Sequence, residues 1–326
     1  MRALVCHEYG PFENLRVENI DDPVLKDHEV LIDVHAAGMN FPDMLLVRGD
    51  YQAKPELPFV AGGECAGTVS AVGPDVKHYK EGDPVIGMSL LGAFAEKMAV
   101  PESGVVSIPQ GMSFEHAAGI SVTYATSYYA LKQVAQLQAN ETVVVLGAAG
   151  GVGLAAVEIA KAMGARVIAA ASTEEKLDAA CDAGADERIN YSVEPLKDRI
   201  KTLTKKKGAD VIYDPVGGDL AEQALRATGW NGRFLVVGFA SGDIPRIPLN
   251  LPLLKSCSIA GVFWGSWSQR FPKESMTNFN ELKTMFEDGK LKPRVKTFPL
   301  TDYVAAFQEI AERRVVGKVV LTMGAA

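Results

Sequence analysis

Several features that would place this chain in a special class are missing from its 326 residues. Its four cysteines, Cys6, Cys65, Cys181 and Cys257, form no C-x-x-C pair. The sequence therefore predicts neither a zinc knuckle nor a disulfide framework, and a reducing, cytoplasmic setting is expected. An excess of basic residues is also missing, because the formal net charge is -7. A protein that holds nucleic acid through its phosphates is thus not expected.

Long apolar segments are missing as well. The N-terminus reaches His7 and Glu8 too early for the apolar stretch of a signal peptide. The longest uncharged apolar run, residues 143–157, is rich in glycine and shorter than the roughly 20 residues that a membrane-spanning helix needs. No membrane segment and no membrane partner are predicted.

What the chain does contain is typical of a globular α/β protein. With 48% apolar residues and this length, two domains are expected, since single cores rarely grow beyond roughly 250 residues. Short strand-like runs separated by Gly and Pro fill the first hundred residues and predict a barrel-like β domain. A helical connector, residues 113–136, follows. Apolar runs then alternate with helical segments, at residues 142–146, 166–171, 210–213, 233–237 and 258–263. This alternation predicts a parallel sheet covered on both faces.

The strongest local signal is TVVVLGAAGGVGLAAVEIAKAMGARVIAAA, residues 142–171, which reads as strand, glycine turn, helix and strand. Glycines bring the backbone of such a turn close to a pyrophosphate, and the helix N-terminus offers N–H groups to the anion. The spacing of Gly147, Gly150 and Gly153 is wider than in G-x-G-x-x-G. A turn that packs a helix on a strand without a ligand is the alternative. We predict dinucleotide binding by Gly147, Ala149, Gly150, Gly151, Val152 and Gly153.

The identity of the dinucleotide is predicted from the end of the second strand. NAD-binding chains place an Asp or Glu there against the ribose 2'-hydroxyl, but residues 169–173 read AAAST. A 2'-phosphate would not be repelled, and Ser172, Lys176 and Tyr191 are predicted to hydrogen-bond it. NADPH is therefore the expected cofactor. Alternatively, Ser172 is a helix N-cap whose capping box is completed by Glu175.

Two early segments, GMNFPDMLLVRGDY at 38–51 and GGECAGTVSAVG at 62–73, resemble the medium-chain dehydrogenase/reductase superfamily. DPVGG at 214–218 and VVGKVVL at 315–321 extend the resemblance over the chain, most closely to the zinc-free quinone oxidoreductases. The resemblance implies a GroES-like β-rich catalytic domain, residues 1–121 and 266–326. It implies a Rossmann domain, a doubly wound parallel sheet, at residues 122–265, with the active site in the cleft between the two. It also implies a homodimer formed through residues 258–263.

The metal site of the zinc alcohol dehydrogenases does not carry over to this chain. Their catalytic zinc is held by a Cys and a His in the two motifs, where this chain has Asn40 and Gly63. Zinc needs three or four converging N, S or O ligands. Cys65, Glu64 and Asp43 would be an improvised set, so no metal is expected.

The resemblance also implies roles for single residues. Asn40 and Tyr51 match positions that line the substrate cleft near the nicotinamide, and Tyr51 would donate a hydrogen bond to the acceptor oxygen. Asp43, one helical turn from Asn40, is predicted to orient the site. The alternatives are a first-turn helix acid for Asp43 and a loop aromatic beside Pro55 for Tyr51. Further cofactor contacts are predicted at Thr126, Phe239, Phe263, Gly265 and Lys318.

These residues together predict the reaction. Without a Lewis acid, quinones and enones are easier hydride acceptors than plain ketones, because the negative charge is delocalised. The expected function is NADPH-dependent, metal-free hydride transfer to quinones or small α,β-unsaturated carbonyls. One alternative is an enoyl-thioester reductase that binds phosphates through Lys54, Arg246, Arg270 and Lys273. Another is an NADPH-binding protein with little turnover.

Overall fold

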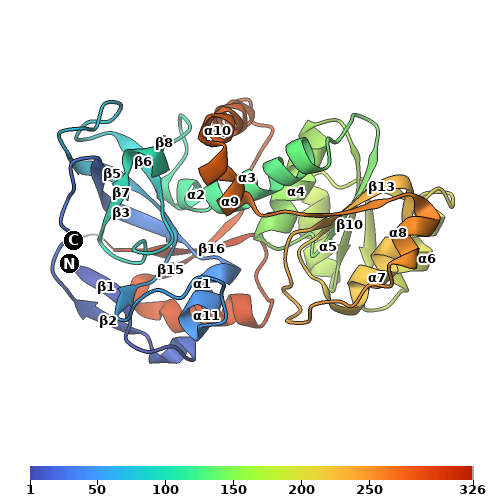
Figure 1. Cartoon of the computed structure of the whole chain (residues 1–326), viewed down its shortest axis with the longest axis horizontal. Helices are drawn as coiled ribbons and strands as arrows, with labels where there is room; N and C mark the ends of the chain where they lie inside the picture. Colours follow the sequence, from blue (N-terminus) through green and yellow to red (C-terminus); the bar gives the residue numbers. More distant parts are fainter. Residues whose placement is uncertain (325–326) are drawn as a thin grey trace. The chain divides into compact units, whose positions relative to one another are not determined.

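The computed structural model describes residues 1–324 and divides into two compact units (Figure 1). The first unit combines Met1–Val122 with the C-terminal segment from Pro293, and the second is Thr123–Lys292. Among the described residues, no helix is long and apolar enough to cross a membrane.

The first unit is rich in β-structure. A three-stranded antiparallel sheet has the order β2-β1-β4, with bounds Arg16–Asn19, Arg2–Cys6 and Phe59–Val60. A seven-stranded sheet has the order β15-β16-β3-β5-β6-β8, and β7 also pairs with β3. Its strands are β3 (Glu29–Gly38), β5 (Glu64–Val72), β6 (Pro84–Met88), β7 (Lys97–Pro101), β8 (Val105–Ser107), β15 (Val295–Pro299) and β16 (Lys318–Thr322). The expected β domain is confirmed.

Short helices connect these strands and close their core. They are α1 (Phe41–Arg48), α2 (Phe114–Ala118), α11 (Tyr303–Ala311) and the 3-10 turns η1 (Phe12–Asn14), η2 (Glu102–Gly104) and η4 (Leu300–Asp302). The core forms where apolar strand residues meet the C-terminal helix: Ile32, Phe94 and Phe307 are fully buried. Each such side chain stabilises the fold by roughly 1.5–3 kcal/mol, which anchors the strands that carry the polar residues described below.

The second unit is a six-stranded parallel sheet of order β11-β10-β9-β12-β13-β14. Its strands are β9 (Thr142–Leu146), β10 (Arg166–Ala171), β11 (Glu187–Asn190), β12 (Ala209–Asp214), β13 (Thr228–Val236) and β14 (Ser258–Gly261). Numbered from β9, this is the order 3-2-1-4-5-6 of a doubly wound dinucleotide-binding sheet. The predicted Rossmann fold is confirmed. β11 was not predicted, because its sequence ERIN is too polar to read as a strand.

Helices connect these strands. They are α4 (Gly151–Ala162), α5 (Glu174–Asp182), α6 (Leu196–Leu203), α7 (Gly218–Arg226), α8 (Asn250–Lys255), α9 (Trp264–Arg270) and α10 (Pro272–Glu287). Before the sheet, α3 (Ser121–Tyr129) runs into the π-helical turn η3 (Ala130–Val134).

Residues 266–292 lie in the second unit rather than in the catalytic domain to which we assigned them. The reason is a set of polar contacts between α10 and the α3–η3 segment. Tyr128 donates a hydrogen bond to Glu281 at 2.7 Å, and Gln133 donates to Asn278 at 2.9 Å. Sequence periodicity does not report such partners.

Candidate functional site

The glycine turn follows β9 directly. Gly147 has φ +58°, a left-handed conformation that favours glycine. A Cβ at Gly153 would lie 2.2 Å from the carbonyl oxygen of Gly147. Helix α4 begins at Gly151, and the first N–H groups of a helix have no intrahelical partner. The backbone thus forms a cradle that fits an anionic pyrophosphate.

A hydrogen-bond chain ties α3 to this cradle. Ser127 donates from Oγ to the carbonyl oxygen of Val152 at 2.9 Å. Because that bond uses the only hydroxyl hydrogen of Ser127, the Tyr213 hydroxyl, 2.8 Å away, is the donor to Ser127. Burial raises the pKa of Tyr213, which keeps this donor protonated. Thr126, predicted to contact the cofactor, is the half-buried residue before Ser127.

Ser172, Lys176 and Tyr191 lie together at the ends of β10 and β11. Lys176 donates from Nζ to Ser172 Oγ at 3.3 Å, and the Tyr191 N–H donates to the Ala171 carbonyl at 3.1 Å. The cap of α5 is Thr173, whose side chain accepts from the Lys176 N–H. The alternative interpretation of Ser172 as the N-cap is therefore wrong.

One acid in the first turn of α5, beside this corner, has cationic and polar partners of its own. Glu174 accepts a hydrogen bond from Asn190 at 2.7 Å and lies 3.6 Å from the guanidinium of Arg188. Arg188 also pairs with Asp178 at 2.7 Å. These contacts reduce the repulsion that Glu174 would exert on an anion at Ser172.

The remaining predicted cofactor residues of this unit lie after β13 and β14. Phe239 packs against the turn that follows β12: a Cβ at Gly217 would lie 2.9 Å from its ring. Since β9, β12 and β13 are neighbours in the sheet, Phe239 and the glycine turn share its carboxyl edge. Phe263 is 57% exposed and precedes α9, which contains Gly265 in its first turn.

A buried polar cluster occupies the first unit. We call it the Asn40 cluster, and its members are at most 9% exposed: Asn40, Asp43, Glu64, Ser121 and Lys318. The register of the seven-stranded sheet brings them together. Gly38, at the end of β3, pairs with Glu64 on β5 and with Val320 on β16. The first residues of β5 and β16 therefore flank the N-terminus of α1.

Glu64 accepts four hydrogen bonds in this cluster. Its Oε1 accepts from Asn40 Nδ2 at 2.8 Å and from Lys318 Nζ at 2.6 Å. Its Oε2 accepts from the Ser121 hydroxyl and from the Val122 N–H, the latter at 2.8 Å. Such a set of donors compensates a carboxylate that has no contact with solvent. Lys318 also donates to Oδ1 of Asn40.

Asp43 is held in the first turn of α1, as the helix-acid interpretation predicted, and accepts from the Asn40 N–H at 2.6 Å. Burial raises the pKa of Asp43 to about 7, while its bond to the Asn40 N–H opposes the shift. Burial, and then the charge of Asp43, raise the pKa of Tyr51. Tyr51 therefore stays protonated at neutral pH and can act as a donor. Pro55, beside which the alternative places Tyr51, accepts a hydrogen bond from the Tyr9 hydroxyl.

The side chains of this cluster do not fit a zinc ion. Across residues 1–324, no three His, Cys, Asp or Glu side chains converge as a metal-binding group. At the cluster itself, the ammonium of Lys318 and three other donors already use both oxygens of Glu64. A second cation there would replace these bonds and face the Lys318 charge.

Four of the five cluster members were named from the sequence, in other combinations. Asn40 and Asp43 were predicted at the active site, whereas Lys318 was predicted at the cofactor. The described partners of its amino group are Asn40 and Glu64. Glu64 was considered only as an improvised metal ligand, and Ser121 was missed. The available signal was one acid and one lysine within otherwise apolar strands, because buried charges are usually paired.

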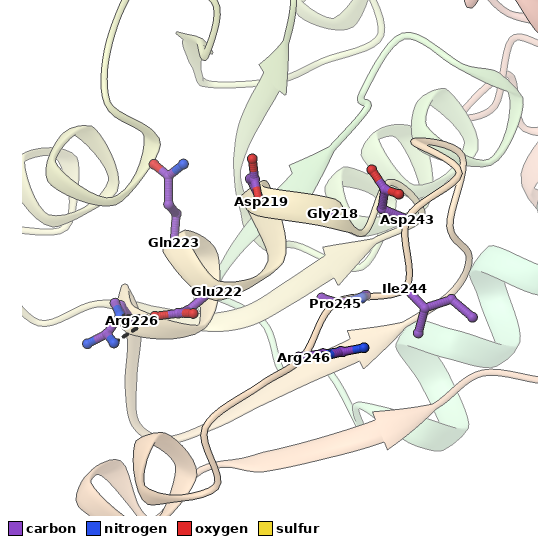
Figure 2. Close-up of a pocket in the computed structure, with 9 residues that line it drawn as sticks. All are labelled: Gly218, Asp219, Glu222, Gln223, Arg226, Asp243, Ile244, Pro245 and Arg246. Carbon is purple, nitrogen blue, oxygen red and sulfur yellow. Dashed lines mark hydrogen bonds and ion pairs between the residues drawn. The ribbon is translucent and has the colours of Figure 1, made fainter.

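A surface pocket of the second unit bears on the thioester alternative (Figure 2). It is lined by Gly218, Asp219, Glu222, Gln223, Arg226, Asp243, Ile244, Pro245 and Arg246. Arg226 is paired with Glu222 at 2.6 Å. Three carboxylates accompany the two arginines, so the pocket does not present the converging cations that phosphates need. Arg246 is the only one of the four expected phosphate-binding cations that lines it.

Comparison with known proteins identifies the family. One family model, described as an alcohol dehydrogenase GroES-like domain, matches residues 26–110, and another, described as a zinc-binding dehydrogenase, matches residues 151–281. A quinone oxidoreductase-like protein 2 homolog of Nematostella vectensis is 42% identical, covering 98% of this chain and 88% of the relative.

Solved structures agree with these matches. Escherichia coli quinone oxidoreductase complexed with NADPH has a TM-score of 0.93 and 31% identity, covering 99% of this chain and 100% of that chain. The CurK enoyl reductase has a TM-score of 0.89 and 31% identity, covering 99% of each chain. The chain belongs to the medium-chain dehydrogenase/reductase superfamily, within its zinc-free quinone oxidoreductase branch. It is an oxidoreductase, as the resemblance implied.

Proposed function

We propose that this oxidoreductase uses NADPH to reduce quinones or small α,β-unsaturated carbonyls without a metal. One observation carries the proposal: the chain combines a backbone cradle suited to a dinucleotide with a buried polar cluster built from hydrogen-bond donors rather than metal ligands. Electron-poor acceptors suit such a cluster, because their negative charge spreads over several atoms and needs only modest stabilisation.

The preference for NADPH is supported by the corner at the end of β10. Ser172, Lys176 and Tyr191 provide hydroxyl and ammonium donors there, and the strand ends without a carboxylate. A 2'-phosphate is a dianionic acceptor that matches these donors. The structure of the Escherichia coli relative was determined with NADPH.

In this mechanism each residue has a limited task. The bound nicotinamide supplies the hydride. The N–H groups at the start of α4 hold the pyrophosphate, and Ser172 and Lys176 hold the 2'-phosphate. Asn40 and Tyr51 donate hydrogen bonds to the acceptor oxygen as it becomes negative. The raised pKa of Tyr51 keeps its proton in place until a stronger base forms.

The test is oxidation of NADPH and NADH with 1,4-benzoquinone, an α,β-unsaturated ketone and an enoyl thioester, offered side by side. We expect turnover with NADPH and with the quinone or the ketone, and much less with NADH. A preference for NADH would contradict the role of the β10 corner. Tight NADPH binding without turnover of any acceptor would favour the binding-protein alternative.

The enoyl-thioester alternative is favoured by the likeness to the CurK enoyl reductase. Its substrates carry phosphates or a carrier protein, which need a cationic surface. Against it, Arg246 lies in a pocket with three carboxylates. Arg270 donates a hydrogen bond to the Ser266 hydroxyl at 3.3 Å. Turnover of the thioester alone in the same assay would establish this alternative.

A homodimer through β14 is also part of the proposal. β14 is an edge strand, paired on one side with β13. Near it, Leu253 is 78% exposed, Leu254 68% and Ile259 39%. An unpaired edge beside apolar side chains is a surface that a second copy can cover. Light scattering should give twice the chain mass, and Ile259→Lys should shift it towards the monomer.

A further inference from the structure

The Asn40 cluster contains an arrangement that the proposed function does not explain. The side chains of Glu64 and Lys318 both form hydrogen bonds with the side-chain amide of Asn40. Asn40 Nδ2 donates to Glu64 Oε1 at 2.8 Å, and Lys318 Nζ donates to Asn40 Oδ1. Lys318 Nζ also donates to the same Glu64 oxygen at 2.6 Å. The three side chains therefore form a closed ring of hydrogen bonds.

This ring decides which end of the amide is the oxygen. A flipped amide would turn its NH₂ group towards the Lys318 ammonium and its oxygen towards the Glu64 carboxylate. Both contacts would then join groups of like polarity, in a place where unmet hydrogen bonds are costly. The amide of Asn40 is thus held in one orientation.

The same ring of hydrogen bonds allows the Asn40 side chain only one kind of hydrogen bond to a ligand. Its oxygen is used by Lys318, and one of its two Nδ2 hydrogens is used by Glu64. The Asn40 side chain also donates a hydrogen bond to the carboxyl of Asp43, so a ligand oxygen would share this second Nδ2 hydrogen with Asp43. Asn40, at 9% exposure, can therefore meet a ligand as a donor and not as an acceptor.

The ring is anchored on rigid elements. The second oxygen of Glu64 is fixed by the Ser121 hydroxyl and the Val122 N–H. The backbone of Asn40 is fixed by Asp43. Glu64 and Lys318 are the first residues of β5 and β16, both in the central part of the sheet. Rotation of the amide would have to break several of these bonds together.

We propose that Glu64 and Lys318 are positioning residues that make Asn40 a fixed, donor-only group for an oxyanion. The identity of that oxyanion, the acceptor oxygen after hydride transfer, rests on the proposed function. Asn40 gives up no proton: its N–H stabilises the negative oxygen until Tyr51 or solvent protonates it. Since the charges of Glu64 and Lys318 cancel, their effect is orientation rather than net potential.

The probe is 4-nitrophenolate, an oxyanion that accepts hydrogen bonds and takes no hydride, titrated by absorbance in the presence of NADP⁺. The test variant is the charge-neutral Glu64→Gln/Lys318→Met, which removes the ring without leaving an unpaired charge. We expect its affinity for the probe to fall by about tenfold or more. Lys318→Arg, which keeps a cationic donor, should stay within about threefold of the unmodified protein.

Arg233→Met is the matched control. It breaks a partly buried ion pair, Arg233 with Glu141 at 2.6 Å, in the other unit of the chain; these side chains are 20% and 22% exposed. We expect probe affinity to be unchanged there, although the protein is less stable. If the unmodified protein does not bind the probe, or the double variant binds it equally well, the positioning role is overturned.

Steady-state kinetics distinguish a positioning role from a general loss of structure in the double variant. The double variant should lose more kcat with the α,β-unsaturated ketone than with 1,4-benzoquinone, because the enolate formed from the ketone spreads its charge over fewer atoms than the aromatic hydroquinone anion does. The KM for NADPH should not change. Equal loss with both acceptors would overturn the proposal. No turnover by the unmodified protein, with the probe result intact, would overturn the proposed function instead and leave the positioning role supported.

Discussion

The glycine turn and the Asn40 cluster are built in opposite ways. The turn is continuous in sequence, from β9 to the start of α4, and works through its backbone. The cluster joins four separate segments and works through side chains, with Lys318 and Glu64 254 residues apart. A backbone site is sensitive mainly to added atoms. A side-chain cluster is sensitive to the loss of any partner, because each member completes the hydrogen bonds of another.

The largest effect on stability is expected from Lys318→Met. Glu64 would keep three donors but lose its counter-charge at a fully buried position. Breaking a buried pair in this way costs about 3–5 kcal/mol of the free energy of unfolding. Urea denaturation, monitored by circular dichroism, measures the loss.

The control for this prediction is the double change Glu64→Gln/Lys318→Met. It should recover more than half of the lost stability, because no unpaired charge is left. If Lys318→Met lowers the free energy of unfolding by less than about 1 kcal/mol, solvent or a neighbouring group compensates the charge of Glu64. The cluster would then be less sensitive to the loss of one partner than its contrast with the glycine turn requires.

The glycine turn should lose affinity for NADPH when a side-chain atom is added to it. In Gly153→Ala the new Cβ would lie 2.2 Å from the Gly147 oxygen, so the backbone must shift. We expect NADPH affinity to fall about 100-fold, the upper range for overpacking. Quenching of protein fluorescence measures it. Gly10→Ala, where the nearest atom is 3.5 Å from the new Cβ, should leave binding unchanged. Normal affinity in Gly153→Ala would contradict the cradle.

Continuity in sequence also decided what could be predicted. β9 and β10 have the predicted bounds, and the turn between them was read from one motif. Asn40 and Asp43 were predicted because they share a short segment. The link from Glu64 to Ser121, 57 residues away, depends on sheet register and on where α3 begins. Hydrophobic periodicity gives neither. The placement of residues 266–292 was missed for a similar reason, since polar contacts attach α10 to α3 and η3.

A third prediction concerns pH and the buried acid of the cluster. The pKa of Asp43 is raised from 3.8 to about 7 by burial. The unfolded chain therefore ionises Asp43 first, and the stability present at low pH is lost as pH rises through this range. Asp43→Asn keeps an acceptor for the Asn40 N–H and removes the titration.

The difference in unfolding free energy, variant minus unmodified protein, should grow by about 4 kcal/mol between about pH 4 and pH 8. Urea denaturation at several pH values gives this difference. If it does not change with pH, Asp43 is ionised throughout, and the cluster holds two negative charges against one positive charge.

The smallest effect is expected at the β10 corner, where side chains add selectivity to the backbone site. Lys176→Met removes the ammonium that donates to Ser172. We expect the KM for NADPH to rise about tenfold, with the KM for NADH unchanged, because only NADPH carries the 2'-phosphate. Lys197→Met is the matched control and should alter neither value; Lys197 is a half-buried lysine of α6 that lies 3.5 Å from Asp198. An equal rise for both cofactors would assign Lys176 to the common part of the dinucleotide. Selectivity would then have to reside in the turn itself, and the division between a backbone cradle and a side-chain corner would no longer hold.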